Sequence, residues 1–197
     1  ADRLGVPYYL GSEATGRDVE YEFTALDDGQ TLTVGDYDIE AIHAPGHTSD
    51  MTNYLVDGRF LLTGDTLFVE SVGRTELQFG DDDAATGAKL LYATLHDTLL
   101  SLPDETRVLP GHVSVDADGR YGVAAPGELV SATLGDLRAD LDLLSMDESA
   151  FVARVADDTP EKPVNYERVI DINTGRASVG DEEEATELEL GPNNCAA

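Results

Sequence analysis

Three sharp turns, each next to an apolar run, constrain the fold of this chain more than any other feature. Each turn places a potential metal ligand directly after a glycine: His47 after Gly46, Asp65 after Gly64 and His112 after Gly111. Glycine lets the backbone turn sharply, and side chains at the carboxyl ends of strands point into the crevice where α/β sheets bind ligands. Because imidazoles and carboxylates bind divalent metals, the pattern predicts that the three residues converge on one cation-sized site.

Each of these residues also has an ordinary interpretation. A lone histidine is commonly a surface loop residue, and an aspartate after a glycine is a common turn residue. The metal interpretation is favoured because the three turns occur together, and His112 could be a ligand, a hydrogen-bond donor to a ligand or a proton shuttle. Of the other histidines, we expect His43 to pack or to orient His47, and His96 to lie on a helix surface.

Arg74 is the most notable cation, in the segment Gly-Arg-Thr-Glu at 73–76. A guanidinium can bind a substrate carboxylate through two parallel hydrogen bonds. The alternative is a structural ion pair with one of the many nearby acids. The sequence leaves both roles open.

The hydrophobic pattern predicts short strands followed by helices. Apolar runs with turn residues between them predict strands at 8–10, 21–24, 30–34, 37–43, 51–56, 59–62 and 107–109. Gly35-Asp36 and Asp57-Gly58 are hairpin signals. Helical spacing predicts helices at 84–99, 129–144, 149–156 and 164–172, with Asp83 and Asp147 as caps. These strands and helices indicate an α/β protein in which helices cover one mixed sheet of about five to six strands.

The chain is expected to contain one domain, residues 1–175, and an acidic mobile tail, residues 176–197. Hydrophobic residues make up 41% of the 197 residues, enough to bury a core. The opening residues read as the end of a helix, which suggests a domain that begins inside an element. A polar loop is predicted at 114–126.

The charge balance is extreme, with 40 acidic against 12 basic residues and a formal net charge of −28. Nucleic-acid binding is disfavoured because phosphates require clustered Lys and Arg. Dispersed acids with only two lysines predict a protein adapted to high salt, where counterions screen self-repulsion. No run approaches a membrane span of about 20 apolar residues, and Cys195 stands alone, so we expect a cytoplasmic protein without disulfides or a membrane partner.

Four motifs in this order resemble the metallo-β-lactamase-fold superfamily, most closely its persulfide dioxygenase and glyoxalase II (hydroxyacylglutathione hydrolase) branch. They are Ala-Pro-Gly-His-Thr at 44–48, Thr-Gly-Asp-Thr-Leu-Phe at 63–68, Val-Gly-Arg-Thr-Glu-Leu at 72–77 and Leu-Pro-Gly-His at 109–112. The resemblance covers about residues 1–175 and implies a partial αββα sandwich. The third motif is more similar to persulfide dioxygenases than to glyoxalase II.

The resemblance implies a role for each site residue. His47 and Asp65 would be metal ligands. His112 would be the last metal-site histidine, a ligand in dinuclear hydrolases but usually not in mononuclear iron dioxygenases. Asp65 and His112 would take part in catalysis, and Arg74 would lie by the pocket for a small thiol derivative. The implied metal is Fe(II), with Zn(II) as the alternative.

The family's His-x-His-x-Asp-His motif is missing, as are the strands that precede it. The sequence therefore predicts an N-terminally truncated domain with an incomplete metal site. Three hypotheses follow: a persulfide dioxygenase with weak metal binding and little turnover, a thioester hydrolase, or a non-catalytic fragment. In the last case the chain would bury an exposed sheet face by self-association as a homo-oligomer.

Overall fold

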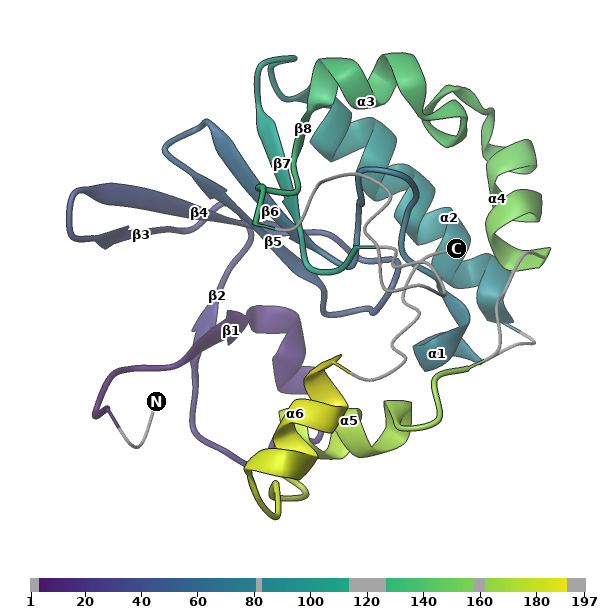
Figure 1. Ribbon diagram of the computed structural model, residues 1–197. Coiled ribbons are helices and arrows are strands. Elements are labelled where there is room, and N and C mark those ends of the chain that lie inside the picture. Colours follow the sequence, from purple (N-terminus) through teal and green to yellow (C-terminus); the bar gives the residue numbers. More distant parts are fainter. Residues whose placement is uncertain (1–3, 81–82, 114–126, 158–161, 191–197) are drawn as a thin grey trace.

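The elements of the fold lie in two sheets, with helices on both sides of the larger one (Figure 1). The structure is a computed structural model and describes residues 4–80, 83–113, 127–157 and 162–190. The strands are β1 (Tyr9–Gly11), β2 (Thr24–Leu26), β3 (Thr31–Val34), β4 (Tyr37–His43), β5 (Thr52–Val56), β6 (Phe60–Gly64), β7 (Arg107–Pro110) and β8 (Ala132–Thr133). The α-helices are α1 (Glu76–Phe79), α2 (Ala84–Ala93), α3 (Leu134–Asp140), α4 (Glu148–Asp157), α5 (Tyr166–Asn173) and α6 (Glu182–Leu190). Shorter helical turns are η1 (Ser12–Gly16), the π-helical η3 (Thr94–Thr98), η4 (Leu99–Ser101) and η5 (Asp142–Ser145).

The larger sheet has six strands in the order β3-β4-β5-β6-β7-β8. All neighbours are antiparallel except β6 and β7, which are parallel, so the sheet is mixed. The turn between β5 and β6 holds Asp57 at φ 51° and Gly58 at φ 63°, the left-handed geometry of a tight hairpin turn, and the Arg59 N–H donates to the Val56 carbonyl oxygen at 3.0 Å to close it. Both predicted hairpins are confirmed, as is the prediction of an α/β fold with helices on a mixed sheet.

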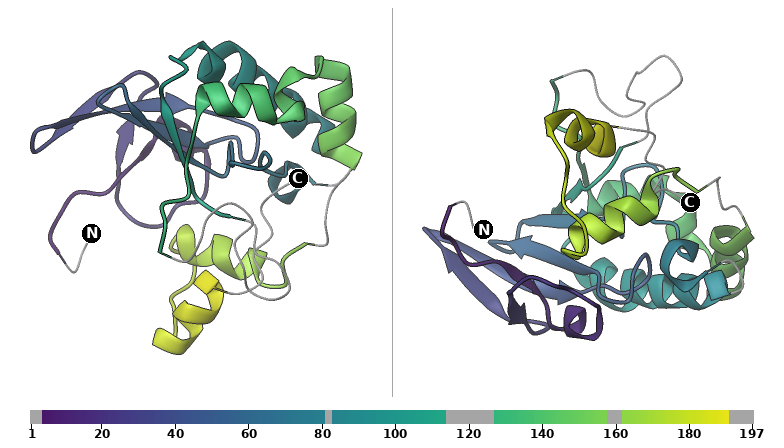
Figure 2. Two further views of the ribbon diagram at one scale, coloured as in Figure 1. Left: turned by 45° about the horizontal axis from the view of Figure 1, so that its top comes forward. Right: turned by 90° about the horizontal axis from the view of Figure 1, so that it is seen from below.

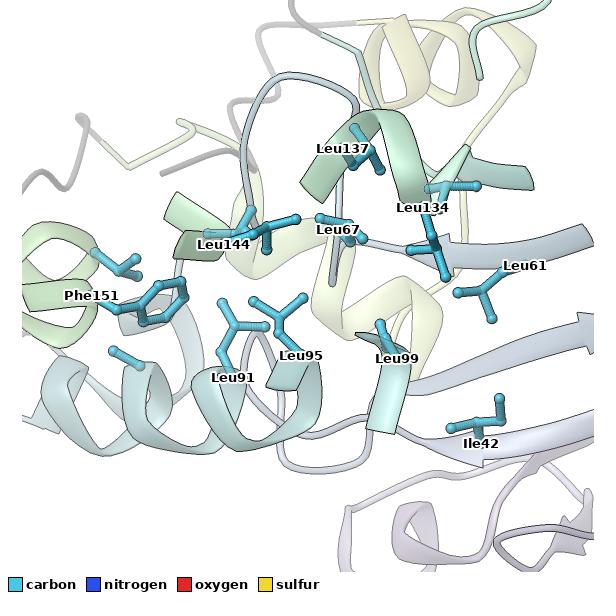
Figure 3. Close-up of a cluster of buried hydrophobic side chains, with 14 of the residues drawn as sticks. Ile42, Leu61, Leu67, Leu91, Leu95, Leu99, Leu134, Leu137, Leu144 and Phe151 are labelled. Carbon is cyan, nitrogen blue, oxygen red and sulfur yellow. The ribbon is translucent and has the colours of Figure 1, made fainter. Parts of the chain in front are cut away.

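One face of this sheet packs against the helices to form the core. Ile42, Leu55, Leu61 and Val108 are the sheet's contribution. The helical contribution comes from Leu91 of α2, Leu95 of η3 and Leu99 of η4, with Leu134, Leu137, Leu144 and Phe151 from α3, η5 and α4 (Figure 3). The spacing of four residues from Leu91 to Leu99 places these side chains on one helix face. This packing fixes the sheet beneath the loops that carry the site.

The other face of the sheet is apolar but incompletely covered. Register pairs Tyr54 with Leu62 and Val56 with Phe60, and these alternate with the core residues on neighbouring positions. Leu62 is 41% exposed although it lies on a central strand. The small parallel sheet of β1 and β2 and the helices α5 and α6 lie on this side (Figures 1 and 2). Self-association through the uncovered part stays a prediction, and light scattering in molar salt is its test.

Several predicted elements need correction. The helix expected at 129–144 is instead the short edge strand β8 followed by α3 and η5. The strand expected at 21–24 is shifted to Thr24–Leu26. The described residues form eight strands in two sheets, six of them in the larger one, where the sequence predicted one sheet of about five to six strands. The loop expected at 114–126 and the first three residues lie outside the described residues.

The acidic segment after residue 175 contains the helix α6, which the sequence analysis did not predict. Arg168 of α5 forms an ion pair with Glu184 of α6 at 2.8 Å. The backbone N–H of Gly180 donates to the Glu184 carboxylate, and together with Arg168 it lowers the pKa of Glu184. The mobility of residues 176–197 stays a prediction. In the part of the chain that the structure describes, no helix is long and apolar enough to cross a membrane.

His96 does not lie on an open helix surface as expected. Its ring stacks on Tyr92 with the centroids 4.1 Å apart. Its Nε2 is buried, and among the described residues it has no hydrogen-bond partner. Burial disfavours the imidazolium and lowers the pKa of His96, against a smaller opposite effect of Asp97.

The lowered pKa makes stability depend on pH. The ordinary histidine pKa is about 6.5. Below that pH the His96 side chain binds a proton more readily in the unfolded chain than in the folded one, so the free energy of unfolding should decrease as the pH is lowered. His96→Phe keeps an aromatic ring against Tyr92 but cannot titrate. We expect urea unfolding to show a weaker pH dependence for this variant below that pH. The same slope in both proteins would contradict the assignment.

Candidate metal site

The three predicted residues lie where β4, β6 and β7 end. Asp65 directly follows β6, and His112 is the second residue after β7. The parallel strands pair Gly64 with Pro110, and the Gly111 N–H donates to the Gly64 carbonyl oxygen at 2.8 Å. A Cβ on Gly111 would lie 3.0 Å from Gly64 backbone atoms, so glycine allows these two turns to touch.

The His47 turn is held against the helix layer. Gly46 has φ 155°, and a Cβ there would lie 2.7 Å from the Leu91 Cα. The Thr94 hydroxyl donates to the Pro45 carbonyl oxygen at 2.7 Å. His43 Nε2 donates to the Ser49 carbonyl oxygen at 2.9 Å, so His43 holds the same loop from its other side. The loop that carries His47 is thereby fixed to rigid elements.

A second set of hydrogen bonds, made by buried polar side chains, holds the Asp65 turn. The buried Asn53 side chain donates to the Thr63 carbonyl oxygen and to the Thr66 hydroxyl, each at 2.9 Å. The Thr63 hydroxyl donates to the Leu67 carbonyl oxygen at 2.6 Å. These hydrogen bonds hold the backbone on both sides of Asp65.

Asp65 is the centre of the cluster. Its Oδ1 accepts a hydrogen bond from His112 Nδ1 at 2.5 Å, and its Oδ2 lies 3.6 Å from His47 Nε2. His47 is buried, whereas the His112 side chain is 42% exposed. The turns from three strand ends therefore do bring these side chains together.

The chemical types of these donors fit a metal centre, and part of their geometry fits one as well. Two neighbouring tetrahedral ligands with bonds of about 2.1 Å lie roughly 3.4 Å apart, close to the separation of His47 Nε2 and Asp65 Oδ2. His112 Nδ1 bonds Asp65 directly instead of facing a shared point. Residues 4–80, 83–113, 127–157 and 162–190 contain no group of three or more His, Cys, Asp or Glu side chains arranged to hold a metal ion. His47 and Asp65 are two facing donors, half of the four ligands of a tetrahedral zinc site.

The second nitrogen of His47 is also engaged. Nδ1 donates to the Arg74 carbonyl oxygen at 2.7 Å. A histidine that donates from one ring nitrogen presents the other as a lone pair, which is the arrangement that metal-ligating histidines adopt. This bond directs Nε2 toward Asp65.

The Arg74 side chain is completely buried. Its Nε donates to Glu76 Oε1 at 2.6 Å, and Nη2 pairs with the same oxygen. Of the two roles that the sequence left open, this geometry favours the structural ion pair. A substrate contact by Arg74 stays untested.

A cavity of about 550 Å³ opens beside the cluster. His47, Asp65 and His112 line one side, and Tyr166, Val169 and Ile170 of α5 line another. The Arg17 guanidinium donates to Asp50 at 2.7 Å on the same wall. Burial and a hydrogen bond with Tyr8 raise the pKa of Tyr21 to about 12, so its hydroxyl stays protonated and donates to the Asn173 carbonyl oxygen.

Sequence reasoning missed several of these residues. Arg17 and the α5 side chains lie far from the motifs in sequence and meet the site only through the fold. Asp50 follows the first motif by two residues, but nothing in the sequence showed that it pairs with Arg17. Glu76 stood inside a motif that the sequence analysis quoted, but nothing in the sequence showed that it pairs with Arg74.

Comparison with known proteins identifies relatives of this chain. The family model described as the metallo-beta-lactamase superfamily matches residues 7–112. A probable hydroxyacylglutathione hydrolase of Schizosaccharomyces pombe is 35% identical over 97 residues, which cover 48% of this chain and 35% of the relative. The mitochondrial persulfide dioxygenase ETHE1 of Homo sapiens is 31% identical over 88 residues, which cover 44% of this chain and 32% of the relative.

A solved metallo-beta-lactamase structure from Staphylococcus aureus superposes with a TM-score of 0.73. It is 23% identical and covers 87% of this chain and 52% of that chain, so the likeness is one of fold. The matched part of the chain spans less than half the length of the curated relatives named above.

Proposed function

Because the chain belongs to the metallo-beta-lactamase superfamily, we propose that it serves metal-dependent chemistry on a small thiol derivative, of the persulfide dioxygenase type. The reaction would convert a thiol persulfide, O₂ and water to the thiol, sulfite and two protons. The observation that supports this most is the spacing of 3.6 Å between His47 Nε2 and Asp65 Oδ2 beside a cavity of about 550 Å³. The similarity to a persulfide dioxygenase agrees with it.

Different residues of the chain would bind the metal and transfer protons. His47 and Asp65 would hold the metal, and the Asp65 carboxylate would offset part of its charge. Bound there, Fe(II) would supply open coordination positions for a sulfur atom and for O₂. His112 holds a proton on Nδ1 against Asp65 and is partly exposed at the cavity, so it can deliver or accept a proton there.

The cavity suits a small organic thiol. Its lining includes the apolar side chains of Leu10, Met51 and Leu77 and the aromatic rings of Tyr8 and Tyr166. The Arg17–Asp50 pair adds one positive and one negative group. A carrier with an apolar body and a polar end matches this surface.

Thioester hydrolysis is the alternative. It would use the same donors with Zn(II), which activates water toward a thioester carbonyl. The similarity to a probable hydroxyacylglutathione hydrolase favours this reading. In this case His112 would act as a further ligand and would have to leave Asp65.

Metal analysis with two activity assays separates the candidates. We expect the chain to bind Fe(II) or Zn(II) weakly, with a Kd of about 1 μM or higher, because the described residues supply half of a site. Slow oxygen uptake with a thiol persulfide would support the dioxygenase. Cleavage of a lactoyl thioester without oxygen uptake would support the hydrolase. Tight stoichiometric iron with fast uptake would refute the half-site argument, and failure to bind either metal would refute both functions.

A further inference from the structure

The segment Gly73–Glu76 holds a buried ion pair between residues that are only two positions apart. Arg74 is completely buried and Glu76 is 1% exposed. The guanidinium bonds Glu76 Oε1 through both Nε and Nη2. Glu76 Oε2 is buried and has no hydrogen-bond partner among the residues that the structure describes. Burial of the two charges and of an oxygen without a hydrogen bond therefore costs folding free energy.

This pair acts on the backbone that holds His47. Only Thr75 separates Arg74 from Glu76. The contact between their side chains therefore restricts the two peptide groups between them, and with these the direction of the Arg74 carbonyl. That carbonyl oxygen is the acceptor for His47 Nδ1 at 2.7 Å. The hydrogen bond leaves Nε2 as the free lone pair that faces Asp65.

Other contacts hold the same segment. The Thr75 hydroxyl donates to the Ala84 carbonyl oxygen at 2.9 Å and ties the segment to α2. The Gly73 N–H lies 3.3 Å from the Thr66 carbonyl oxygen. A buried ion pair generally stabilises no more than apolar side chains of similar volume, so stability alone does not explain this one.

We propose that Glu76, through Arg74, is a positioning residue for His47. Its carboxylate locks the Arg74 side chain and backbone so that the carbonyl oxygen selects the Nδ1–H tautomer of His47 and directs Nε2 to the metal. The inference rests on the proposed metal site for its effect on affinity, but the tautomer is a property of the metal-free chain.

The double variant Arg74→Met with Glu76→Met tests the proposal. It removes both charges and keeps similar volume, so the Tm should stay close to that of the wild type or rise. We expect affinity for Co(II), measured by titration of its absorption bands, to fall about 10- to 100-fold. In the metal-free variant, nitrogen NMR of His47 should show a mixture of tautomers instead of Nδ1–H alone. The matched control, Arg168→Met with Glu184→Met, removes the pair between α5 and α6 and should change neither readout.

Arg74→Lys keeps the charge but loses the two-point contact with Glu76, and it covers the case in which the double variant does not fold. We expect a roughly threefold to tenfold loss of Co(II) affinity and a partly mixed tautomer. A folded double variant, or Arg74→Lys, with wild-type affinity and Nδ1–H alone on His47 would overturn the proposal. If the wild type binds no metal, the proposed function fails, while the NMR comparison still decides the role of Glu76.

Discussion

Asp65→Asn is expected to weaken metal binding at least about 100-fold, or about 2.8 kcal/mol. The carboxylate lies between the two imidazoles, 3.6 Å from His47 Nε2 and 2.5 Å from His112 Nδ1. A neutral amide is a poorer ligand for a divalent cation and cannot offset its charge. Isothermal titration with Zn(II) or Co(II) measures the loss.

The control for this experiment is Asp50→Asn. Asp50 lines the same cavity but pairs with Arg17, so its replacement should change the affinity less than about threefold, or 0.7 kcal/mol. The titrations belong in molar KCl, where the Debye length is about 3 Å and the acidic surface binds few cations non-specifically. Equal losses in both variants would show that the cation binds to acidic surface rather than to the cluster.

Gly73→Ala is expected to destabilise the fold by about 3 kcal/mol or more. A Cβ at Gly73 would lie 1.8 Å from the Asp65 carbonyl oxygen and 3.3 Å from the His47 Cβ. Both neighbours belong to turns held by hydrogen bonds, so neither can move cheaply. Thermal unfolding should show a Tm lower by about 6–12 °C, at about 2–4 °C per kcal/mol for a chain of this size, and the metal affinity should fall with it.

Gly16→Ala is the matched control because a Cβ there meets no atom within 4 Å. Replacing an unstrained glycine reduces the entropy of the unfolded chain, so we expect a change between zero and about 1 kcal/mol of stabilisation. A Gly73→Ala protein as stable as the Gly16→Ala protein would show that the segment Gly73–Glu76 does not pack against the site as described.

The hairpins and the convergence of the site could be predicted because their signals are local. Asp57 and Gly58 fix the β5–β6 turn by their own backbone preferences. His47, Asp65 and His112 each follow a strand and a glycine. Once those strands share one sheet, their carboxyl ends bring the side chains together.

The errors concern elements that depend on contacts distant in sequence. β8 is two residues long and exists only because it pairs with β7, so no periodic pattern marks it. A local signal for the start of α3 was present, because the Thr133 hydroxyl accepts from the Asp136 N–H as an N-cap. The half-buried position of His96 depends on stacking with Tyr92, and its exposed neighbour Asp97 favoured the prediction of a surface position.

Arg74 shows the same limit at the site itself. The sequence left a substrate contact and a structural ion pair open for its side chain. The fold buries the guanidinium against Glu76, and the Arg74 carbonyl oxygen accepts a hydrogen bond from His47, a role that the sequence did not indicate. A backbone group has no signature in the sequence. Such a role follows only from the three-dimensional contacts of the proposed metal-binding histidine.

Anomalous diffraction at the zinc edge from crystals grown with Zn(II) tests most directly whether His47 and Asp65 hold a metal. We expect one peak at about 2.0–2.2 Å from both His47 Nε2 and an Asp65 carboxylate oxygen. Peaks confined to carboxylates elsewhere on the surface, with none between these two side chains, would contradict the account.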